Sequence, residues 1–338
     1  MLQIKCKPKK PKQEIDMKIL RKRQGKRFQE LGIIIAAAAL FLLFTALNPK
    51  FASITNLLNL GRQVSTIGIM SIGMTFLIIG GNFDLSVGSM FAFISTVVAA
   101  LVVNEVNILI ALLLGILLGA FIGLINGILS TYGKIPSFVV GLGMLNVLRG
   151  GQLLITGASP IVVEWSAGGF GMEFFAFLGK GKLFDVIPMM LTSFLILLAI
   201  GYFILKKTKF GFHTFAVGAS PQAAEIAGIR VKWVQAMGFV VTGVMVSIAS
   251  MLQLSFIGSV TGQVGVGYEL EAIAAVIIGG TKLSGGDGTI IGTLIGAIVM
   301  GALRNGLVLL SVSAFWQTLI IGVVIIIAVA IDKWTARD

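Results

Sequence analysis

Long apolar segments alternate with short polar intervals along almost the whole chain. Many of these segments approach the ~20 residues that an α-helix needs to cross a hydrocarbon core of ~30 Å. Gly, Asn, Asp or Lys separates most of them. The pattern predicts an all-α polytopic membrane protein with about ten transmembrane helices in one domain over residues 31–334. The predicted spans fall near residues 31–47, 63–79, 87–103, 108–130, 135–156, 186–205, 233–257, 269–281, 289–310 and 315–331.

The composition agrees with a membrane protein. Hydrophobic residues make up 57% of the chain and charged residues 12%, against ~25% charged residues in a soluble domain. The net charge of +12 could indicate nucleic-acid binding, but eleven of the 26 Lys and Arg residues lie in the first 27 positions. This placement before the first span is typical of a cytoplasmic flank. We therefore expect a basic cytoplasmic tail over residues 1–30 and no nucleic-acid partner.

The basic residues also predict the topology. Six crossings separate the tail from the basic interval 206–232, which places this interval in the cytoplasm as well. The interval 157–185 then becomes an outer loop. Ten predicted crossings return the C-terminal Lys333 and Arg337 to the inside. Both termini are therefore predicted to be cytoplasmic, and the first span is predicted to be an uncleaved anchor.

One short helix is predicted within the interval 206–232. Ser220 can cap its first free N–H groups, Pro221 suits its first turn, and Gly228 can adopt the left-handed conformation after its last turn. Seven residues span only ~10 Å, too little to cross a bilayer. We expect a surface helix that contacts a soluble partner, and we interpret His213 as a solvated loop residue. The candidate coupling residues are Ser220, Pro221, Ala223, Ala224, Glu225 and Gly228.

Two polar breaks, at residues 78–88 and 277–286, resemble each other. Each follows a span that is predicted to enter the cytoplasm. Non-helical backbone at membrane depth occurs only where protein or a water-filled cavity satisfies it. Paired breaks therefore indicate a pathway or a gate, and interfacial turns with Ser and Asp as helix caps are the alternative. The candidate gate residues are Gly81, Asn82, Asp84, Ser86, Gly279 and Gly280.

Charged residues inside the predicted spans form a third pattern. Such residues are energetically costly and usually pair or line a wet cavity. All of them fall toward the predicted outer face, so we expect an outer mouth in which they pair with one another or with a partner. Arginines that extend to the membrane interface are the alternative. The residues are Arg62, Arg149, Glu269, Glu271 and Arg304.

Glycine recurs at every fourth position in the span near 108–130. Small residues at this spacing allow close approach of two helices in lipid. We expect ordinary packing within the chain rather than a sliding interface. The residues are Gly115, Gly119, Gly123 and Gly127.

Motifs for catalysis and metal binding are missing from the sequence. A Gly-x-x-x-x-Gly-Lys-Ser/Thr phosphate loop does not occur, so another subunit must hydrolyse any ATP. One histidine and one cysteine, Cys6, leave no metal-ligand cluster and no Ser-His constellation. We therefore expect no catalytic residue, no metal site and no cofactor on this chain, and we do not expect an enzyme.

Several motifs resemble the permease subunits of ribose-type sugar ABC importers, a family with ribose, xylose, galactose and autoinducer-2 branches. The strongest are residues 73–76 and 80–89. The resemblance covers about residues 50–334. Asn82, Lys282 and Arg304 depart from the family pattern, which leaves the exact solute open. The further matches are Asn126 with Gly127, and the segments 133–138, 210–229, 267–274, 279–281 and 305–307.

This resemblance implies one half of a permease pair in the bacterial plasma membrane, either a homodimer or a heterodimer of paralogues. ATP-binding subunits that carry ATP and Mg²⁺ would bind inside, and an extracytoplasmic solute-binding protein would bind outside. The short helix at residues 220–228 falls where such permeases place their coupling helix. The transported solute would be a sugar or a sugar-like compound.

An ion-coupled secondary carrier is the alternative function. Asp84 or Glu271 would then serve as a proton or cation site, because intramembrane carboxylates commonly mark such sites. An intramembrane enzyme is the third possibility, and no visible nucleophile and base support it. Uptake by the purified chain, driven by an ion gradient without ATP, would distinguish the carrier from the ABC permease.

Overall fold

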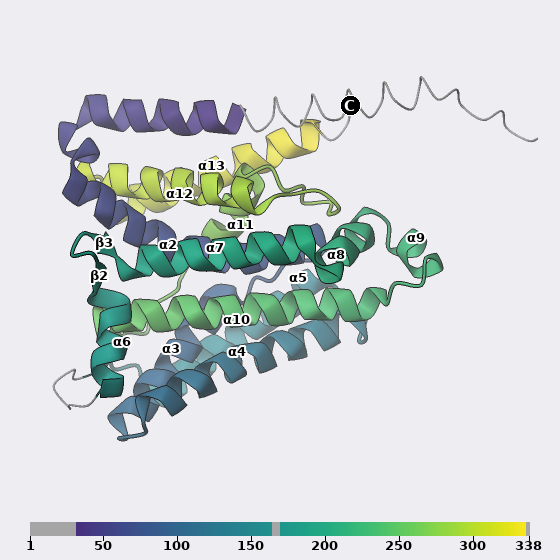
Figure 1. Cartoon of the computed structure of the whole chain (residues 1–338), viewed down its shortest axis with the longest axis horizontal. Coiled ribbons are helices and arrows are strands. Elements are labelled where there is room, and N and C mark those ends of the chain that lie inside the picture. Colours follow the sequence, from purple (N-terminus) through teal and green to yellow (C-terminus); the bar gives the residue numbers. More distant parts are fainter. Residues whose placement is uncertain (1–31, 164–169, 336–338) are drawn as a thin grey trace, which may run out of the picture.

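A computed structural model describes residues 32–163 and 170–335 of the chain. The helices lie side by side along one long axis and form a bundle (Figure 1). The strands in the described residues are two residues long each. The predicted helical class is therefore confirmed.

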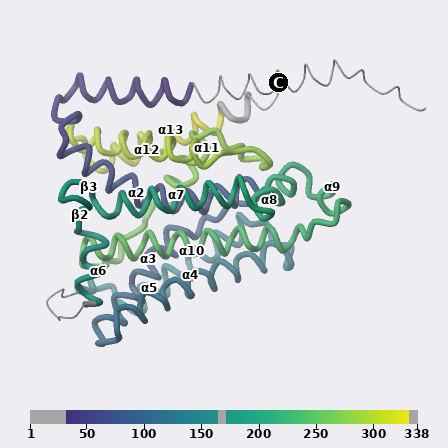
Figure 2. Tube along the Cα trace, viewed as in Figure 1, coloured from purple at the N-terminus to yellow at the C-terminus, as the bar shows by residue number. Residues whose placement is uncertain are grey.

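The order of the elements along the chain can be followed in the Cα trace (Figure 2). The helical elements are Gly32–Leu47, η1 Pro49–Ala52, α2 Ile54–Ile79, α3 Val87–Val103, α4 Ile108–Thr131, α5 Ser137–Thr156, α6 Phe170–Lys180, α7 Met189–Lys207, α8 Lys209–Ala219, α9 Pro221–Ile226, α10 Val231–Ile257, α11 Tyr268–Ile278, α12 Ile290–Leu309 and α13 Ala314–Thr335. The strands are β1 Ile161–Val162, β2 Lys182–Leu183, β3 Ile187–Pro188 and β4 Ser259–Val260, with β1 antiparallel to β4 and β2 antiparallel to β3.

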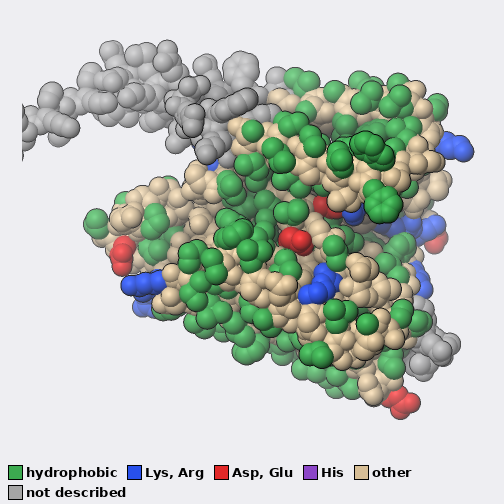
Figure 3. All heavy atoms as spheres, turned by 180° about the vertical axis from the view of Figure 1, so that it is seen from behind, with side chains coloured by type: hydrophobic (Ala, Val, Ile, Leu, Met, Phe, Trp, Pro, Cys, Tyr) green, Lys and Arg blue, Asp and Glu red, His purple; other side chains and the backbone are tan. Residues whose placement is uncertain are grey.

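α2 is the central helix of the bundle. Its most apolar window is 89% buried, whereas the corresponding windows of α4, α5 and α7 are only 33%, 22% and 22% buried. Six helices in the described part are long and apolar enough to cross a membrane. Hydrophobic side chains cover much of the face shown in Figure 3. Because the outer helices expose apolar side chains, their outward faces are suited to lipid.

The glycine ridge of α4 packs against α10. A methyl group added at Gly119 would contact the Gly243 carbonyl and the Ser247 hydroxyl, and one at Gly123 would lie 3.1 Å from Val240 Cα. Such close backbone approach needs small residues on both helices. The expectation of ordinary packing within the chain is therefore confirmed.

Several predicted elements differ in the structure. α2 begins at Ile54, well before the predicted start of its span near residue 63. α11 has 11 residues and a length of only ~16 Å, so it cannot cross a ~30 Å core by itself. α6 is a helix inside the predicted outer loop 157–185. His213 lies in α8 and is partly buried, so its interpretation as a solvated loop residue was wrong. Thr208 caps α8 by accepting a hydrogen bond from Gly211 N at 3.3 Å.

The two long polar intervals lie at opposite ends of the bundle. Figure 1 shows α9 projecting at one end, on the right, and α6 with β2 and β3 at the other. We call these the α9 end and the α6 end. Residues 206–232 and 157–185 are thus separated by the length of the helices, as their predicted positions on opposite membrane faces require.

Candidate functional site

α9 is a short helix with a cap at each end. The Ser220 hydroxyl oxygen accepts a hydrogen bond from Ala223 N at 3.3 Å, and Pro221 occupies the first turn. Gly228 follows the helix with φ +82° and donates from its N–H to Glu225 O at 2.9 Å. The predicted helix and its caps are therefore present, whereas its coupling role remains a prediction.

One side of α9 holds it to the bundle and the other side is exposed. Ala224 is buried and clusters with Val217 of α8 and Val234 of α10. Glu225 is exposed, and Ile226 is 89% exposed. α9 therefore presents an apolar and an acidic side chain beyond the end of the bundle, where another protein could contact both.

The two polar breaks have the same backbone geometry. After α2, Gly81 has φ +83° and the Asn82 N–H donates to Leu77 O at 3.0 Å. After α11, Gly280 has φ +83° and the Thr281 N–H donates to Val276 O at 3.1 Å. Both are helix ends closed by a left-handed glycine, which satisfies the last carbonyl groups. The two breaks, which resemble each other in sequence, therefore also have similar backbone conformations.

The two breaks also touch each other. The Gly286 N–H of the second break donates to Ile79 O at the start of the first, at 2.9 Å. A methyl group added at Gly285 would lie 3.1 Å from Gly81 Cα. Gln235 of α10 donates from its amide nitrogen to Gly80 O at 3.2 Å. Segments separated by some 200 residues along the chain therefore form one backbone junction, which we call the break junction.

α8 packs directly on the break junction. A methyl group added at Gly218 would lie 2.6 Å from Gly286 N and would also contact Ile79 O. One added at Gly286 would lie 2.7 Å from Ala219 Cα. Ser220, the cap of α9, follows Ala219 directly. Gly218 and Ala219 of α8 therefore connect α9 to both breaks. The backbone of α8 lies so close to the breaks that a side chain at Gly218 would not fit.

Asp84 joins the first break to α4. One carboxylate oxygen accepts hydrogen bonds from the N–H and the hydroxyl of Ser86, each at 2.7 Å, and the other accepts from the Asn126 amide at 2.9 Å. Asp84 is only 1% exposed. Burial raises the pKa of Asp84 above its ordinary value, and the hydrogen bonds from Ser86 and Asn126 oppose this effect. Both oxygens are satisfied within the protein, so this carboxylate supports the break structurally.

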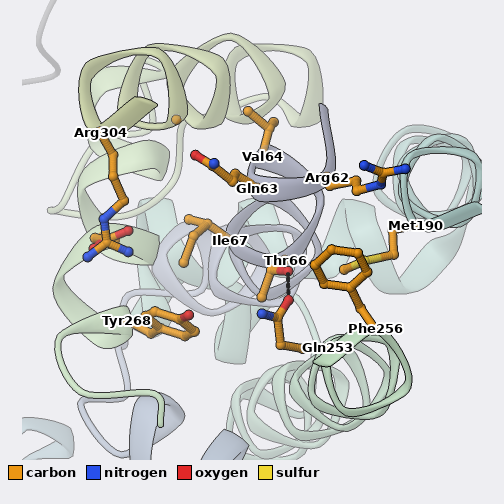
Figure 4. A pocket seen from close by; sticks show the side chains of 12 residues that line it. Arg62, Gln63, Val64, Thr66, Ile67, Met190, Gln253, Phe256, Tyr268 and Arg304 are labelled. Atoms are coloured by element: carbon orange, nitrogen blue, oxygen red, sulfur yellow. Dashed lines mark hydrogen bonds and ion pairs between the residues drawn. The ribbon is translucent and has the colours of Figure 1, made fainter. Parts of the chain in front are cut away.

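Three of the five predicted outer-mouth charges line one pocket toward the α6 end. Arg62, Glu271 and Arg304 border a cavity of about 110 Å³ between α2, α7, α10, α11 and α12 (Figure 4). Arg304 Nη2 lies 2.8 Å from Glu271 Oε1. The Arg62 guanidinium lies over the Phe256 ring at 5.6 Å. We call this cavity the outer pocket.

The other two predicted charges do not border the outer pocket. The Arg149 guanidinium donates to Gln152 Oε1 and to Val264 O at 2.8 Å, and to Gly262 O at 3.2 Å. Arg149 thus fixes the loop between β4 and α11. Glu269 lies against Gly88 at the start of α3. The five charges therefore do not converge on one point, and Glu269 reaches the last residue of the first break.

Sequence reasoning missed two parts of this arrangement. Gly218 was not singled out, because its importance depends on residues that are distant along the chain. Thr66 and Gln253 form a hydrogen bond at 2.9 Å in the outer pocket. A glutamine inside an apolar span is a signal that could have identified this position.

The fold and site define a multi-pass membrane subunit in which an exposed helix connects to paired breaks at the end of the bundle. Residues 56–329 match the family described as Branched-chain amino acid transport system / permease component. The chain belongs to this family of ABC importer permease components, and the resemblance seen in its motifs is confirmed. It is accordingly a multi-pass protein of the bacterial plasma membrane.

Three similar proteins are named sugar permeases. The chain is 42% identical to the ribose import permease protein RbsC of Bacillus subtilis, over 90% of this chain and 93% of the relative. It is 36% identical to RbsC of Escherichia coli K12, over 89% and 92% of the two chains. It is 33% identical to the galactose/methyl galactoside import permease protein MglC of Escherichia coli K12, over 90% and 94%. No solved structure matches the chain.

Proposed function

We propose that this chain is the membrane-spanning permease subunit of a binding-protein-dependent ABC importer for a sugar or a sugar-like solute. Its relatives are named ribose and galactose import permeases, and their similarity extends over about nine-tenths of each chain. Separate ATPase subunits supply the energy and bind ATP and Mg²⁺. The sequence lacks a phosphate loop, which agrees with ATP hydrolysis on separate subunits.

The observation that carries the proposal is the continuous packing from α9 to the break junction. An ATPase subunit contacts the exposed side of α9 around Glu225 and Ile226. Movement of α9 displaces α8, and Gly218 transmits the displacement to Ile79 and Gly286 because their backbones are in direct contact. The two breaks then act as one gate. The candidate gate residues Gly81, Asn82 and Gly279 belong to these two breaks.

The proposed topology has ten membrane passes with both termini in the cytoplasm. Each predicted span overlaps a helix of the structure. α11 begins beside the Glu271–Arg304 pair of the outer pocket, and the loop that follows it reaches Ile79 at the opposite end of α2. α11 and this loop therefore cross the bundle together. The helix Gly32–Leu47 runs toward the α6 end and α13 runs away from it (Figure 1), which agrees with both termini on the α9 side.

The proposed assembly has partners at both ends. ATPase subunits bind at the α9 end, and an extracytoplasmic solute-binding protein binds at the α6 end. A second permease subunit, either another copy of this chain or a paralogue, completes the pathway. The carboxylates invoked for an ion-coupled carrier already have partners, since Asp84 bonds to Ser86 and Asn126, and Glu271 pairs with Arg304.

Charge reversal on α9 tests this function. In the complex reconstituted with its ATPase and binding protein, Glu225→Lys should weaken association of the ATPase subunit and abolish stimulated hydrolysis and uptake. Glu105→Lys is the matched control, because Glu105 is also exposed but lies between α3 and α4 at the α6 end. It should leave association of the ATPase subunit unchanged. Equal behaviour of the two variants would contradict the proposal.

A further inference from the structure

The outer pocket is lined by polar groups from four helices of the bundle. Gln63 and Thr66 come from α2, Gln253 from α10, and Tyr268 from α11. With Arg304 they surround the hollow in Figure 4. Such a concentration of polar side chains inside an apolar bundle marks a site or a pathway rather than a lipid contact. The roles proposed for the break junction and for α9 do not involve these polar side chains.

These groups retain hydrogen-bonding capacity. Gln253 uses its amide oxygen to accept from Thr66 at 2.9 Å, and its amide nitrogen has no hydrogen-bond partner among the described residues. The Tyr268 hydroxyl has none there either. An amide and a phenol hydroxyl each provide both donors and acceptors. The pocket therefore offers both kinds of partner, which is what a solute with several hydroxyl groups requires.

Two of the three charged residues that line the pocket form an ion pair. Glu271 is buried and Arg304 lies 2.8 Å from it, so the two charges neutralise each other. Arg62 donates to Asn59 Oδ1 at 2.8 Å and lies over the Phe256 ring, but it has no acidic partner among the described residues, and its buried Nε has no hydrogen-bond partner there. A charged solute would compete with the Glu271–Arg304 pair, whereas the hydroxyl groups of a neutral solute can bond to unpartnered groups such as those of Arg62 and leave the pair intact. Phe256 also gives the pocket an apolar wall, against which the C–H face of a sugar ring can pack.

The size of the pocket favours a single small molecule. Its volume of about 110 Å³ is below the ~300–1,000 Å³ of sites for drug-sized ligands. A monosaccharide fits this scale better than an oligosaccharide. Five helices meet at the pocket, so any movement that starts at the break junction and shifts α2 or α11 changes its shape.

We infer that the outer pocket is a binding site for one neutral monosaccharide, which the solute occupies before it passes the break junction. This inference rests on the proposed import function and adds the residues that contact the solute. Gln63, Gln253 and Tyr268 bond to its hydroxyl groups. The Glu271–Arg304 pair forms the polar wall of the site.

Protection of an introduced thiol tests the site without any need for ATP. The native chain has one cysteine, Cys6, so Gln63→Cys is made in a Cys6→Ser background and exposed to a membrane-impermeant thiol reagent from the outer face. Gln63 is exposed at the mouth of the pocket and its replacement is compatible with folding. D-ribose or D-galactose at about twice its Kd should slow modification about threefold by mass action.

Two comparisons define the outcome of this experiment. Ser159→Cys, an exposed position after α5, should react at the same rate with and without sugar. L-leucine should give no protection at Gln63→Cys. Lack of labelling at Gln63→Cys, lack of protection by either sugar, or protection by leucine alone would overturn the inference.

A second variant distinguishes an effect on solute binding in the pocket from an effect on energy coupling. In the reconstituted complex, Tyr268→Phe removes one hydroxyl group and should raise the KM for uptake about fivefold, the effect of one net hydrogen bond. ATP hydrolysis stimulated by the binding protein should remain. Tyr202→Phe on α7 is the matched control and should change neither quantity. An unchanged KM in Tyr268→Phe would contradict the site, whereas a wild-type complex without stimulated hydrolysis would contradict only the proposed function.

Discussion

The contact of α8 with the break junction gives a sharp prediction for Gly218→Ala. The added methyl group would lie 2.6 Å from Gly286 N and against the Ile79 carbonyl, both of which are backbone atoms that cannot rotate away. Overpacking of this kind destabilises by ~1–3 kcal/mol. Loss of the Gly286–Ile79 hydrogen bond adds ~1 kcal/mol. We therefore expect a total loss of ~2–4 kcal/mol at this contact.

Gly143→Ala is the matched control for this substitution. Gly143 lies in α5 and has no atom within 4 Å of the position that a methyl group would occupy. The gain in helix propensity from Gly to Ala, at most ~1 kcal/mol, applies to both variants. The difference between the two variants therefore isolates the contact with the break junction.

The assay measures thermal unfolding of the permease in nanodiscs, together with solute uptake and ATP hydrolysis by the reconstituted complex. Gly218→Ala should lower the Tm and reduce the amount of solute transported per ATP hydrolysed, because α8 no longer fits against the breaks. Gly143→Ala should transport as much solute per ATP as the wild type, with a Tm equal to or slightly above that of the wild type because of its higher helix propensity. If the two variants had the same Tm and the same transport per ATP, the mechanical connection through Gly218 would be refuted.

Three other substitutions test separate parts of the account. Ser220→Ala removes the cap of α9, worth ~1 kcal/mol, so amide exchange in α9 should accelerate about fivefold; unchanged exchange would show that the cap is not needed. Asp84→Asn removes a charged acceptor and should lower stability by ~1.5–3 kcal/mol, and an unaltered Tm would contradict its structural role. Arg304→Met leaves Glu271 buried and unpaired, with a loss of ~1–3 kcal/mol, and adding Glu271→Gln should restore most of it. A double variant no more stable than Arg304→Met would contradict the ion pair.

The sequence predicted the helices well because hydrophobic length is a strong local signal. α3 has the predicted bounds, residues 87–103, and α9 has the predicted caps because Ser220, Pro221 and Gly228 are residue types that favour helix ends through local interactions. α11 was predicted too long, because its apolar run continues into the second break, where Gly280 adopts φ +83° and ends the helix. α8 was missed because its composition is mixed and no long apolar run marks it.

The site was predictable only in part, because its central contacts are long-range. The paired breaks were recognised from their similar residues, but their direct contact through Ile79 and Gly286 follows from the packing of α2 against the loop after α11. The charged residues inside the spans were also recognised. The sequence could not predict which of these charged residues share a pocket. Arg62 borders the outer pocket, whereas the Arg149 guanidinium bonds to the carbonyl groups of a neighbouring loop, and this difference depends on long-range packing.

The central claim is that an ATPase subunit contacts α9 in the assembled complex. Site-specific photo-crosslinking measures this contact directly, with a photoreactive amino acid at Ile226, which is 89% exposed. The same residue placed at Glu105, at the opposite end of the bundle, is the control. The account predicts a crosslink from position 226 to the ATPase subunit and none to it from position 105. A complex that hydrolyses ATP and imports solute, but shows no such crosslink from position 226, would contradict it.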